Sequence, residues 1–289
     1  MHDRRIAVPA RQFTAGRRPG VTSQAMTNPM ARASVIPRAN VLGVGVSAID
    51  IPRAIAEMES WIDAADREYV CVTGMHGIVE SQRATPLRLI HNRAGLVTPD
   101  GMPLVWLLWW HGYHHSDRVY GPDLMMATLA HGASRGWRHF LYGARQETLD
   151  LLEARLKQRV PGLNIVGRFS PPFRDLTPEE DAEIVERINA SGADIVWVGL
   201  STPKQERWMA GHRSLLRANV LIGVGAAFDF HAGTVRQAPR FMQRCGLEWS
   251  FRLLTEPRRL WRRYATGIPA FIWGVLLQTA RLRRYPVDW

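Results

Sequence analysis

Short apolar runs alternate with longer amphipathic stretches between about residues 40 and 233. Short apolar runs bounded by turn residues are typical of buried strands in a parallel sheet. They predict strands at 41–46, 69–73, 95–98, 139–142, 164–166, 194–199 and 220–224. The amphipathic stretches predict helices at 52–65, 122–135, 146–159 and 178–190. Strands that alternate with helices of this length predict an α/β, Rossmann-like fold, a mainly parallel sheet flanked by helices.

Composition divides the chain into three parts. Residues 1–38 are rich in Arg, Ala, Pro, Ser and Thr and lack periodicity, so we expect them to form a disordered basic leader. Residues 39–236 carry the alternating pattern and form the expected α/β body. Residues 237–289 are rich in arginine and tryptophan, and they predict an arginine-rich helical C-terminal appendage.

The net charge of +11 comes almost entirely from arginine, since Lys157 and Lys204 are the only lysines. The planar guanidinium group suits phosphate, so the charge predicts a phosphate-rich partner. Nucleic acid, a nucleotide-linked substrate and an anionic membrane surface all fit that description. A genome rich in G and C would explain much of the preference for arginine, but not the clustering of arginines near the C-terminus.

The two cysteines, Cys71 and Cys245, are too few for a disulfide framework or a zinc site. A reducing cytoplasm is therefore the expected compartment. The basic N-terminus is not followed by an apolar core of signal-peptide length. No run approaches the ~20 apolar residues that are needed to span a bilayer.

Polar residues follow the predicted strand 194–199 where the chain enters the next helix. Pro203 is suited to the start of a helix, which places Lys204, Gln205 and Glu206 in the first turn. Open α/β sheets bind ligands at the carboxyl ends of their strands, and a helix N-terminus favours anions. The sequence therefore indicates a phosphate or nucleotide site at this edge.

Three other strand ends carry candidate chemistry. Asp100 follows the strand 95–98 and is open between helix capping and catalysis. His76 follows the strand 69–73 and could be a base, although a lone histidine is more often a structural hydrogen-bonding group. The Gly-Val-Gly segment at 223–225 only loosely resembles a dinucleotide fingerprint, because the third glycine is absent. Each signal is weak by itself.

Taken in order, these segments resemble the WecG/TagA/CpsF family of bacterial glycosyltransferases, from about Val41 to about Tyr264. The resemblance rests on Thr73, Pro-Asp-Gly at 99–101, Arg-Val-Tyr-Gly-Pro-Asp at 118–123, Leu-Tyr-Gly-Ala at 141–144, Pro-Lys-Gln-Glu at 203–206, Gly-Val-Gly at 223–225 with Phe228 and Asp229, Ala-Pro-Arg at 238–240, Leu-Glu-Trp-Ser-Phe-Arg-Leu at 247–253 and Glu-Pro-Arg-Arg at 256–259.

The resemblance implies an inverting glycosyltransferase that moves a sugar from a UDP-sugar donor to an undecaprenyl-diphosphate-linked acceptor. It further implies exopolysaccharide or cell-envelope polysaccharide biosynthesis, without a cofactor or a metal. The protein would then be cytoplasmic and peripheral on the inner face of the cytoplasmic membrane. The best-known members of the family transfer N-acetylmannosamine.

The resemblance also assigns roles to residues. It makes Asp100 the general base that takes the proton of the acceptor hydroxyl, and it places Thr73 near the reacting centre to position the substrate. The sequence has no Asp-x-Asp motif to hold a metal, so cationic side chains are expected to stabilise the leaving diphosphate. The resemblance points to Arg252, Arg259 and Arg262, which would share one face of a continuous helix.

Nucleotide contacts are expected at several strand ends. Tyr142, Gly143 and Ala144 end a predicted strand and could shape a uridine pocket. The other candidates at this edge are Gln205, Glu206, Gly225 and Asp229. Asp229 is open between holding a ribose or sugar hydroxyl and capping a helix.

Residues 268–280 form a short, strongly apolar run that contains Trp273 and has arginines on both sides. This pattern favours an interfacial membrane helix over a spanning one. A buried contact in a homo-oligomer is the alternative, because an exposed apolar patch is normally covered. The membrane-contacting segment is expected at 258–284, through Arg258, Arg263, Arg281, Arg283 and Arg284.

The loop at 73–77 departs from the family pattern. Many relatives carry an asparagine shortly after the threonine, whereas this chain reads Thr-Gly-Met-His-Gly. We expect the loop to face the donor sugar. The donor is therefore open between N-acetylmannosamine and another hexose or uronic acid.

Two other classes of protein are weighed against the glycosyltransferase. A nicotinamide-dependent oxidoreductase would need a complete glycine fingerprint near the first strand, and Gly43 and Gly45 lack a third glycine in place. A nucleic-acid-binding protein would spread basic and aromatic residues over a broad groove. The arginines instead concentrate beside an apolar segment, so a membrane is favoured and no nucleic-acid partner is expected.

Overall fold

The structure, a computed structural model, describes residues 36–288. The predicted leader therefore lies almost entirely outside the described residues. Arg38, which the sequence placed in that leader, is instead the first residue of strand β1 (Arg38–Val41). Its guanidinium donates to the main-chain oxygens of Asn92 and Gly95, at 3.1 and 2.7 Å. The α/β body thus begins before residue 39.

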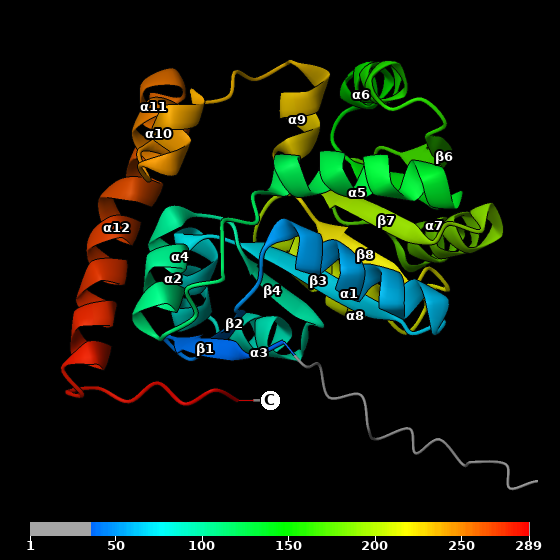
Figure 1. The fold of residues 1–289 in the computed structure, drawn as a ribbon. Helices are drawn as coiled ribbons and strands as arrows, with labels where there is room; N and C mark the ends of the chain where they lie inside the picture. The colour runs from blue at the N-terminus through cyan, green and yellow to red at the C-terminus, as the bar shows by residue number, and fades with distance from the viewer. Residues whose placement is uncertain (1–35, 289) are drawn as a thin grey trace, which may run out of the picture. The chain divides into compact units, whose positions relative to one another are not determined.

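Within the described part of the chain, six strands form one parallel sheet in the order β4-β3-β8-β7-β5-β6 (Figure 1). The strands are β3 (Glu68–Thr73), β4 (Leu96–Pro99), β5 (Arg138–Gly143), β6 (Asn164–Phe169), β7 (Ile195–Gly199) and β8 (Val220–Gly223). Each matches a predicted strand, so the predicted α/β, Rossmann-like fold is confirmed.

The single strand predicted at 41–46 is wrong. The segment forms an antiparallel hairpin of β1 with β2 (Val44–Ser47). Leu42 and Gly43 turn the chain with φ angles of 50° and 80°, and the Asn40 side chain accepts a hydrogen bond from the Gly43 N–H at 2.8 Å. An apolar residue in the left-handed region hid this turn, because turns of this kind usually carry Gly or Asn.

Helices connect the strands and extend beyond the sheet. They are α1 (Ile51–Asp63), α2 (Met75–Arg83), α3 (Thr85–Arg93), α4 (Met102–Trp110), α5 (Gly121–Arg135), α6 (Gln146–Arg159), α7 (Pro178–Ser191), α8 (Lys204–His212), α9 (Ala227–Ala232), α10 (Arg240–Arg244), α11 (Glu248–Thr255) and α12 (Pro257–Thr279). The four predicted helices are confirmed as α1, α5, α6 and α7. Local signals explain such bounds: α7 begins at a capping box of Thr177 and Glu180 and ends before Gly192 in the left-handed region.

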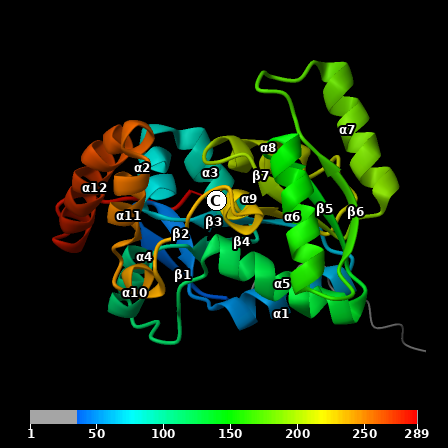
Figure 2. The ribbon, with the colours of Figure 1, turned by 90° about the horizontal axis from the view of Figure 1, so that it is seen from above.

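Alternate residues of each strand enter two apolar clusters, one on each face of the sheet. In β3, Val70 and Val72 pack with α1, α5, α6 and α9, whereas Tyr69 and Cys71 pack with α2, α4, α7 and α8 (Figure 2). Burial on both faces explains why the strands are continuous apolar runs. The sheet is therefore a rigid platform, and its carboxyl-end loops are free to carry chemistry.

The C-terminal helices lie along one side of this body, where α12 packs against α2 (Figure 1). The expected continuous helix is wrong, because the chain breaks at Glu256 between α11 and α12, with φ −133° and ψ 53°. Pro257 explains the break, since the residue before a proline is driven out of the helical region. Among the described residues, no helix combines the length and apolar character that crossing a bilayer would require.

Candidate active site

A cavity of about 240 Å³ opens at the carboxyl ends of β3, β4, β7 and β8. These four strands are adjacent in the sheet, so the loops that follow them converge. The loops supply Gly74, Asp100, Thr202 and Gly225, and the C-terminal helices close the far side. The sequence prediction of a ligand site at this edge agrees with the position of the cavity.

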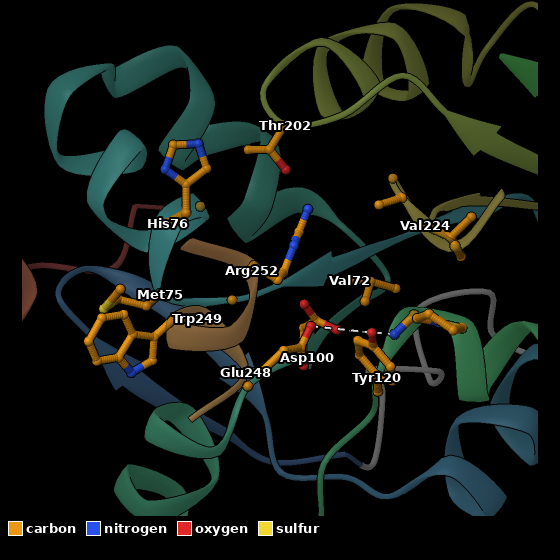
Figure 3. Close-up of a pocket in the computed structure, with 18 of the residues that line it drawn as sticks. Val72, Met75, His76, Asp100, Tyr120, Thr202, Val224, Glu248, Trp249 and Arg252 are labelled. Atoms are coloured by element: carbon orange, nitrogen blue, oxygen red, sulfur yellow. Dashed lines mark hydrogen bonds between the residues drawn. The ribbon is translucent and has the colours of Figure 1, made fainter. Parts of the chain in front are cut away.

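Asp100 lies at the centre of the cavity lining (Figure 3). Its Oδ1 accepts a hydrogen bond from the Gly121 N–H at 3.1 Å, at the first residue of α5. It does not cap the helix that follows it, because the N-cap of α4 is Gly101 and makes no side-chain bond. The main-chain N–H of Asp100 donates to the Thr73 oxygen at 3.0 Å. Asp100 is thus fixed by the end of β3 and the start of α5.

Burial raises the pKa of Asp100 to about 6. The charge of Glu248 also raises this pKa. The charges of Arg118 and Arg252 and the hydrogen bond from Gly121 act in the opposite direction and lower it. A carboxyl with a pKa near neutrality can take up a proton at working pH and release it again. Such a group in a cavity is a candidate general base.

Arg118 joins Asp100 to the C-terminal helices. Its Nε donates to the main-chain oxygen of Asp100 at 2.6 Å, and its Nη2 is ion-paired with Glu248, the first residue of α11. Tyr120 adds a hydrogen bond to Glu248 at 3.2 Å, and the Arg118 guanidinium lies 3.9 Å from the centre of the Tyr120 ring. The group therefore links the loop after β4 to α11.

The expected nucleotide residues separate into two groups. Gln205, Gly225 and Asp229 line the cavity, and the Gln205 Oε1 accepts a hydrogen bond from the Gly225 N–H at 3.0 Å. Glu206 is fully buried beneath them and accepts hydrogen bonds from Thr202 and Gln205 at 2.8 and 3.2 Å. Asp229 is not a helix N-cap, since Ala226 occupies that position in α9.

Tyr142, Gly143 and Ala144 do not line the cavity. They end β5, which lies beyond β7 in the sheet order. Tyr142 is 2% exposed and stacks on Trp208, with ring centroids 4.2 Å apart. Gly143 has φ 121°, and a Cβ there would lie 2.6 Å from the Gly199 oxygen, so close packing of two strand ends requires glycine. This geometry gives a structural reason for these residues.

Thr73 is also buried. Its side chain is 2% exposed, and its Oγ1 donates to the Cys71 oxygen at 3.3 Å rather than entering the cavity. The following residues Gly74, Met75 and His76 do line it. Burial, with the charges of nearby arginines, lowers the pKa of His76 to about 3, so its imidazole is neutral at physiological pH.

The arginines are arranged differently from the expectation. Arg252 and Arg259 line the cavity, as does Arg263, but Arg262 does not. The Arg262 side chain is turned to Trp261, with its guanidinium 5.4 Å from a ring centroid. Helical geometry explains the difference, because Arg263 follows Arg259 by about one turn of α12, whereas Arg262 points about 100° away from Arg263 around the helix.

Comparison with known proteins identifies the chain. The model of the glycosyl transferase WecG/TagA/CpsF family matches residues 39–285. The chain belongs to this family. It is also 34% identical, over 185 residues, to an N-acetylglucosaminyldiphosphoundecaprenol N-acetyl-beta-D-mannosaminyltransferase of Bacillus spizizenii, an alignment that covers 64% of this chain and 69% of that protein. Membership of the WecG/TagA/CpsF family selects a glycosyltransferase among the classes that the sequence left open.

Sequence reasoning missed several side chains of this glycosyltransferase cavity. Arg118, Tyr120 and Glu248 were noticed only as parts of matching segments, and Arg263 was assigned to the membrane. The spacing of four residues between Arg259 and Arg263 was the signal that places both on one face of a helix. In residues 36–288, no three His, Cys, Asp or Glu side chains gather closely enough to hold a metal ion. Arginine supplies the positive charge found in the cavity.

Proposed function

We propose that this glycosyltransferase moves a hexose or uronic acid, with N-acetylmannosamine as the first candidate, from a UDP-sugar to an undecaprenyl-diphosphate-linked saccharide. The observation that carries the proposal is the buried Asp100 carboxyl, set in a cavity that arginines also line. The named activity of the Bacillus spizizenii relative, which acts on an undecaprenol-diphosphate-linked sugar, supports the same reaction. The product would enter exopolysaccharide or cell-envelope polysaccharide.

Asp100 is the general base of the proposed reaction. The acceptor hydroxyl oxygen attacks the anomeric carbon of the donor and forms the new C–O bond, while its proton passes to Asp100. The bond from the anomeric carbon to the diphosphate breaks on the opposite face, and UDP leaves with the electron pair. This single displacement inverts the anomeric centre. Thr73 acts through its main-chain oxygen, which holds the Asp100 N–H at 3.0 Å.

The leaving diphosphate gains negative charge as the bond breaks, and fixed cations stabilise it. Arg252 and Arg259 are the cations in our proposal, because both line the same cavity as Asp100. Guanidinium groups bind phosphate oxygens in a bidentate manner. We therefore propose a transfer that does not depend on a metal.

The donor sugar is proposed to lie against the start of α2, where Met75 and His76 occupy the first turn. Both residues line the cavity, and this segment departs from the family pattern seen in the sequence. Asp229 also lines the cavity, and burial raises the pKa of its carboxyl. We assign it to a hydroxyl of the ribose or the sugar, together with Gln205.

The transfer assay tests this proposal. The purified protein is incubated with a panel of UDP-sugars and a polyprenyl-diphosphate-linked N-acetylglucosamine acceptor, with and without a chelator. We expect transfer from one donor, with inversion at the anomeric carbon and no loss of rate in the chelator. A retained anomeric configuration would contradict the displacement mechanism, and a rate abolished by the chelator would contradict metal independence. No transfer from any donor would overturn the proposed substrates.

The C-terminal helices are proposed to rest on the inner face of the cytoplasmic membrane. Ile272, Trp273 and Leu276 of α12 are 53%, 64% and 56% exposed. Trp110 of α4 is 75% exposed and, like Val275 of α12, lines a crevice between the two helices. Exposed tryptophans and neighbouring arginines are typical of an interfacial surface. This surface would bring the cavity to a lipid-linked acceptor.

Removing this apolar surface is expected to release the protein from membranes. We predict that Trp273→Ser combined with Leu276→Ser weakens binding to phosphatidylglycerol vesicles by at least about tenfold, because one buried large apolar side chain contributes about 1.5–3 kcal/mol. Leu151→Ser on α6, an exposed leucine outside the C-terminal helices, is the matched control. Unchanged vesicle binding, with a concentration-dependent dimer lost in the double variant, would instead assign the surface to a second copy.

A further inference from the structure

Three arginines of the C-terminal helices line the cavity, and they differ in how their charge is balanced. Arg252 and Arg259 share the carboxylate of Glu256. The Arg252 Nη2 lies 3.6 Å from the Glu256 Oε1, and Arg259 is paired with the Oε2 of the same residue. The two guanidinium groups of this pair are thus held in place by a protein carboxylate.

Arg263 has no such partner. Its side chain forms no hydrogen bond or ion pair with any of residues 36–288, and its Nε is buried without an acceptor. Burial lowers the pKa of Arg263, and the charges of Arg252 and Arg259 lower it further. Tyr264 and Asp100 act in the opposite direction and raise this pKa. A half-buried charge without a counter-ion is unfavourable. This arrangement is typical of a site whose anion arrives with a ligand.

The position of Arg263 separates it from the Glu256-paired arginines. It follows Arg259 by four residues on α12, so it lies on the same face about 6 Å farther along the helix. That direction leads toward the exposed apolar residues Ile272 and Trp273. Arg263 is therefore the cavity arginine nearest to the proposed membrane-contacting end of α12.

We propose that Arg263 binds the diphosphate of the lipid-linked acceptor, as a second anion site distinct from that of the donor diphosphate. The inference rests on the proposed function, which brings two diphosphates to one cavity. The donor diphosphate engages Arg252 and Arg259, whereas the acceptor diphosphate, carried on a membrane lipid, enters from the apolar end of α12 and meets Arg263. The imidazole of His76, which also lines the cavity, can donate a hydrogen bond to this diphosphate.

Direct binding tests the inference without requiring turnover. Farnesyl diphosphate serves as a short polyprenyl diphosphate and UDP as the donor diphosphate, each titrated calorimetrically into the full-length protein. We expect Arg263→Gln to weaken farnesyl diphosphate binding about tenfold or more and to change UDP binding less than about twofold. Arg262→Gln, at the adjacent exposed arginine outside the cavity, is the matched control and should change neither.

Kinetics provide the second measurement. Arg263→Gln should raise the KM for the polyprenyl-diphosphate-linked acceptor about tenfold and leave the KM for the UDP-sugar unchanged. With a neutral alkyl glycoside of the same acceptor sugar, the variant and the wild type should have the same rate. Arg263→Lys keeps the positive charge but lacks the planar, bidentate guanidinium group. Its KM for the polyprenyl-diphosphate-linked acceptor should therefore rise less than that of Arg263→Gln.

Some results would overturn the inference. Equal weakening of UDP and farnesyl diphosphate, or weakening of UDP alone, would assign Arg263 to the donor. A loss with the neutral glycoside as large as that with the diphosphate acceptor would assign it a structural role. Farnesyl diphosphate binding that depends on Arg263 in a protein that transfers no sugar would overturn the proposed function and leave the anion site standing.

Discussion

Replacing Asp100 with asparagine is expected to lower the rate of sugar transfer by about a thousandfold and to stabilise the folded protein above pH 6. Loss of a general base typically costs 10²–10⁴ in rate. The side-chain carbonyl of the introduced asparagine can still accept the hydrogen bond that the Gly121 N–H now gives to Asp100 at 3.1 Å. The geometry of the site is thereby preserved, so the change isolates the proton transfer.

The gain in stability follows from the shifted pKa. Burial raises the pKa of Asp100 from 3.8 to about 6 in the folded state. The folded state therefore binds the proton more tightly than the unfolded state, and its relative stability falls as the pH rises through about 6. At pH 8 this difference amounts to about 3 kcal/mol. Asparagine does not ionise, so the Asp100→Asn variant does not lose this folding stability as the pH rises.

Thermal unfolding of the two proteins between pH 4 and pH 8 measures this effect. The melting temperature of Asp100→Asn should exceed that of the wild type at pH 8, and the difference should vanish near pH 4. The wild-type rate should in turn rise with pH through about 6, as the base loses its proton. Asp123→Asn, at an exposed carboxyl of α5, should change neither property.

Equal transfer rates in the wild type and Asp100→Asn would assign Asp100 a structural role at the N-terminus of α5. A variant that is inactive and also less stable at pH 8 would show that asparagine disturbs the site. The proposed role of Asp100 as a base would therefore oppose stability, as is common for catalytic carboxyls that must stay buried. The opposite signs of the two effects make the prediction specific.

The sequence predicted the sheet because burial on both faces leaves a continuous apolar run in every central strand. It also located the edge of the sheet where the cavity opens, since Asp100 and Gly225 each follow such a run closely. The hairpin of β1 and β2 was missed because Leu42, an apolar residue, adopts the left-handed conformation that its turn requires. Helices α2 and α3, of nine residues each, were not predicted.

The choice among the arginines followed the resemblance to the family rather than helical spacing. Arg262 was chosen from the family spacing, but Arg263, four residues after Arg259 on α12, lies on the face that meets the cavity. The assignment of Tyr142 to a nucleotide pocket rested only on its position at the end of a predicted strand. In the structure its ring stacks on Trp208 of α8, a contact between distant segments that sequence spacing does not reveal.

The second large effect is expected from breaking the ion pair of Arg118 with Glu248. The two side chains are only 13% and 16% exposed. Glu248→Ala would leave the Arg118 guanidinium largely buried without its carboxylate, which we expect to destabilise the protein by about 3 kcal/mol. Denaturant unfolding measures that loss. Arg83→Ala, which breaks the exposed pair with Glu80, should cost less than about 1 kcal/mol and serves as the control.

The same change should lower catalysis through position rather than chemistry. Arg118 also holds the main-chain oxygen of Asp100 at 2.6 Å, and Glu248 begins the helix that carries Arg252. Breaking the pair therefore loosens the positions of both Asp100 and Arg252. We expect kcat to fall even under conditions where the protein is fully folded. Trypsin should also cut at the arginines of α12 sooner in Glu248→Ala.

A double-mutant cycle tests whether the effects of replacing Arg118 and Glu248 are coupled or independent. If the ion pair couples α11 to Asp100, Arg118→Ala should add little to the loss in stability and rate that Glu248→Ala already causes. Additive losses in the double variant, with wild-type trypsin cleavage of α12 in Glu248→Ala, would mean that the two residues act independently. Coupled losses would instead show that the ion pair of Arg118 with Glu248 positions both α11 and Asp100. The C-terminal helices would then contribute to the active site through this one contact.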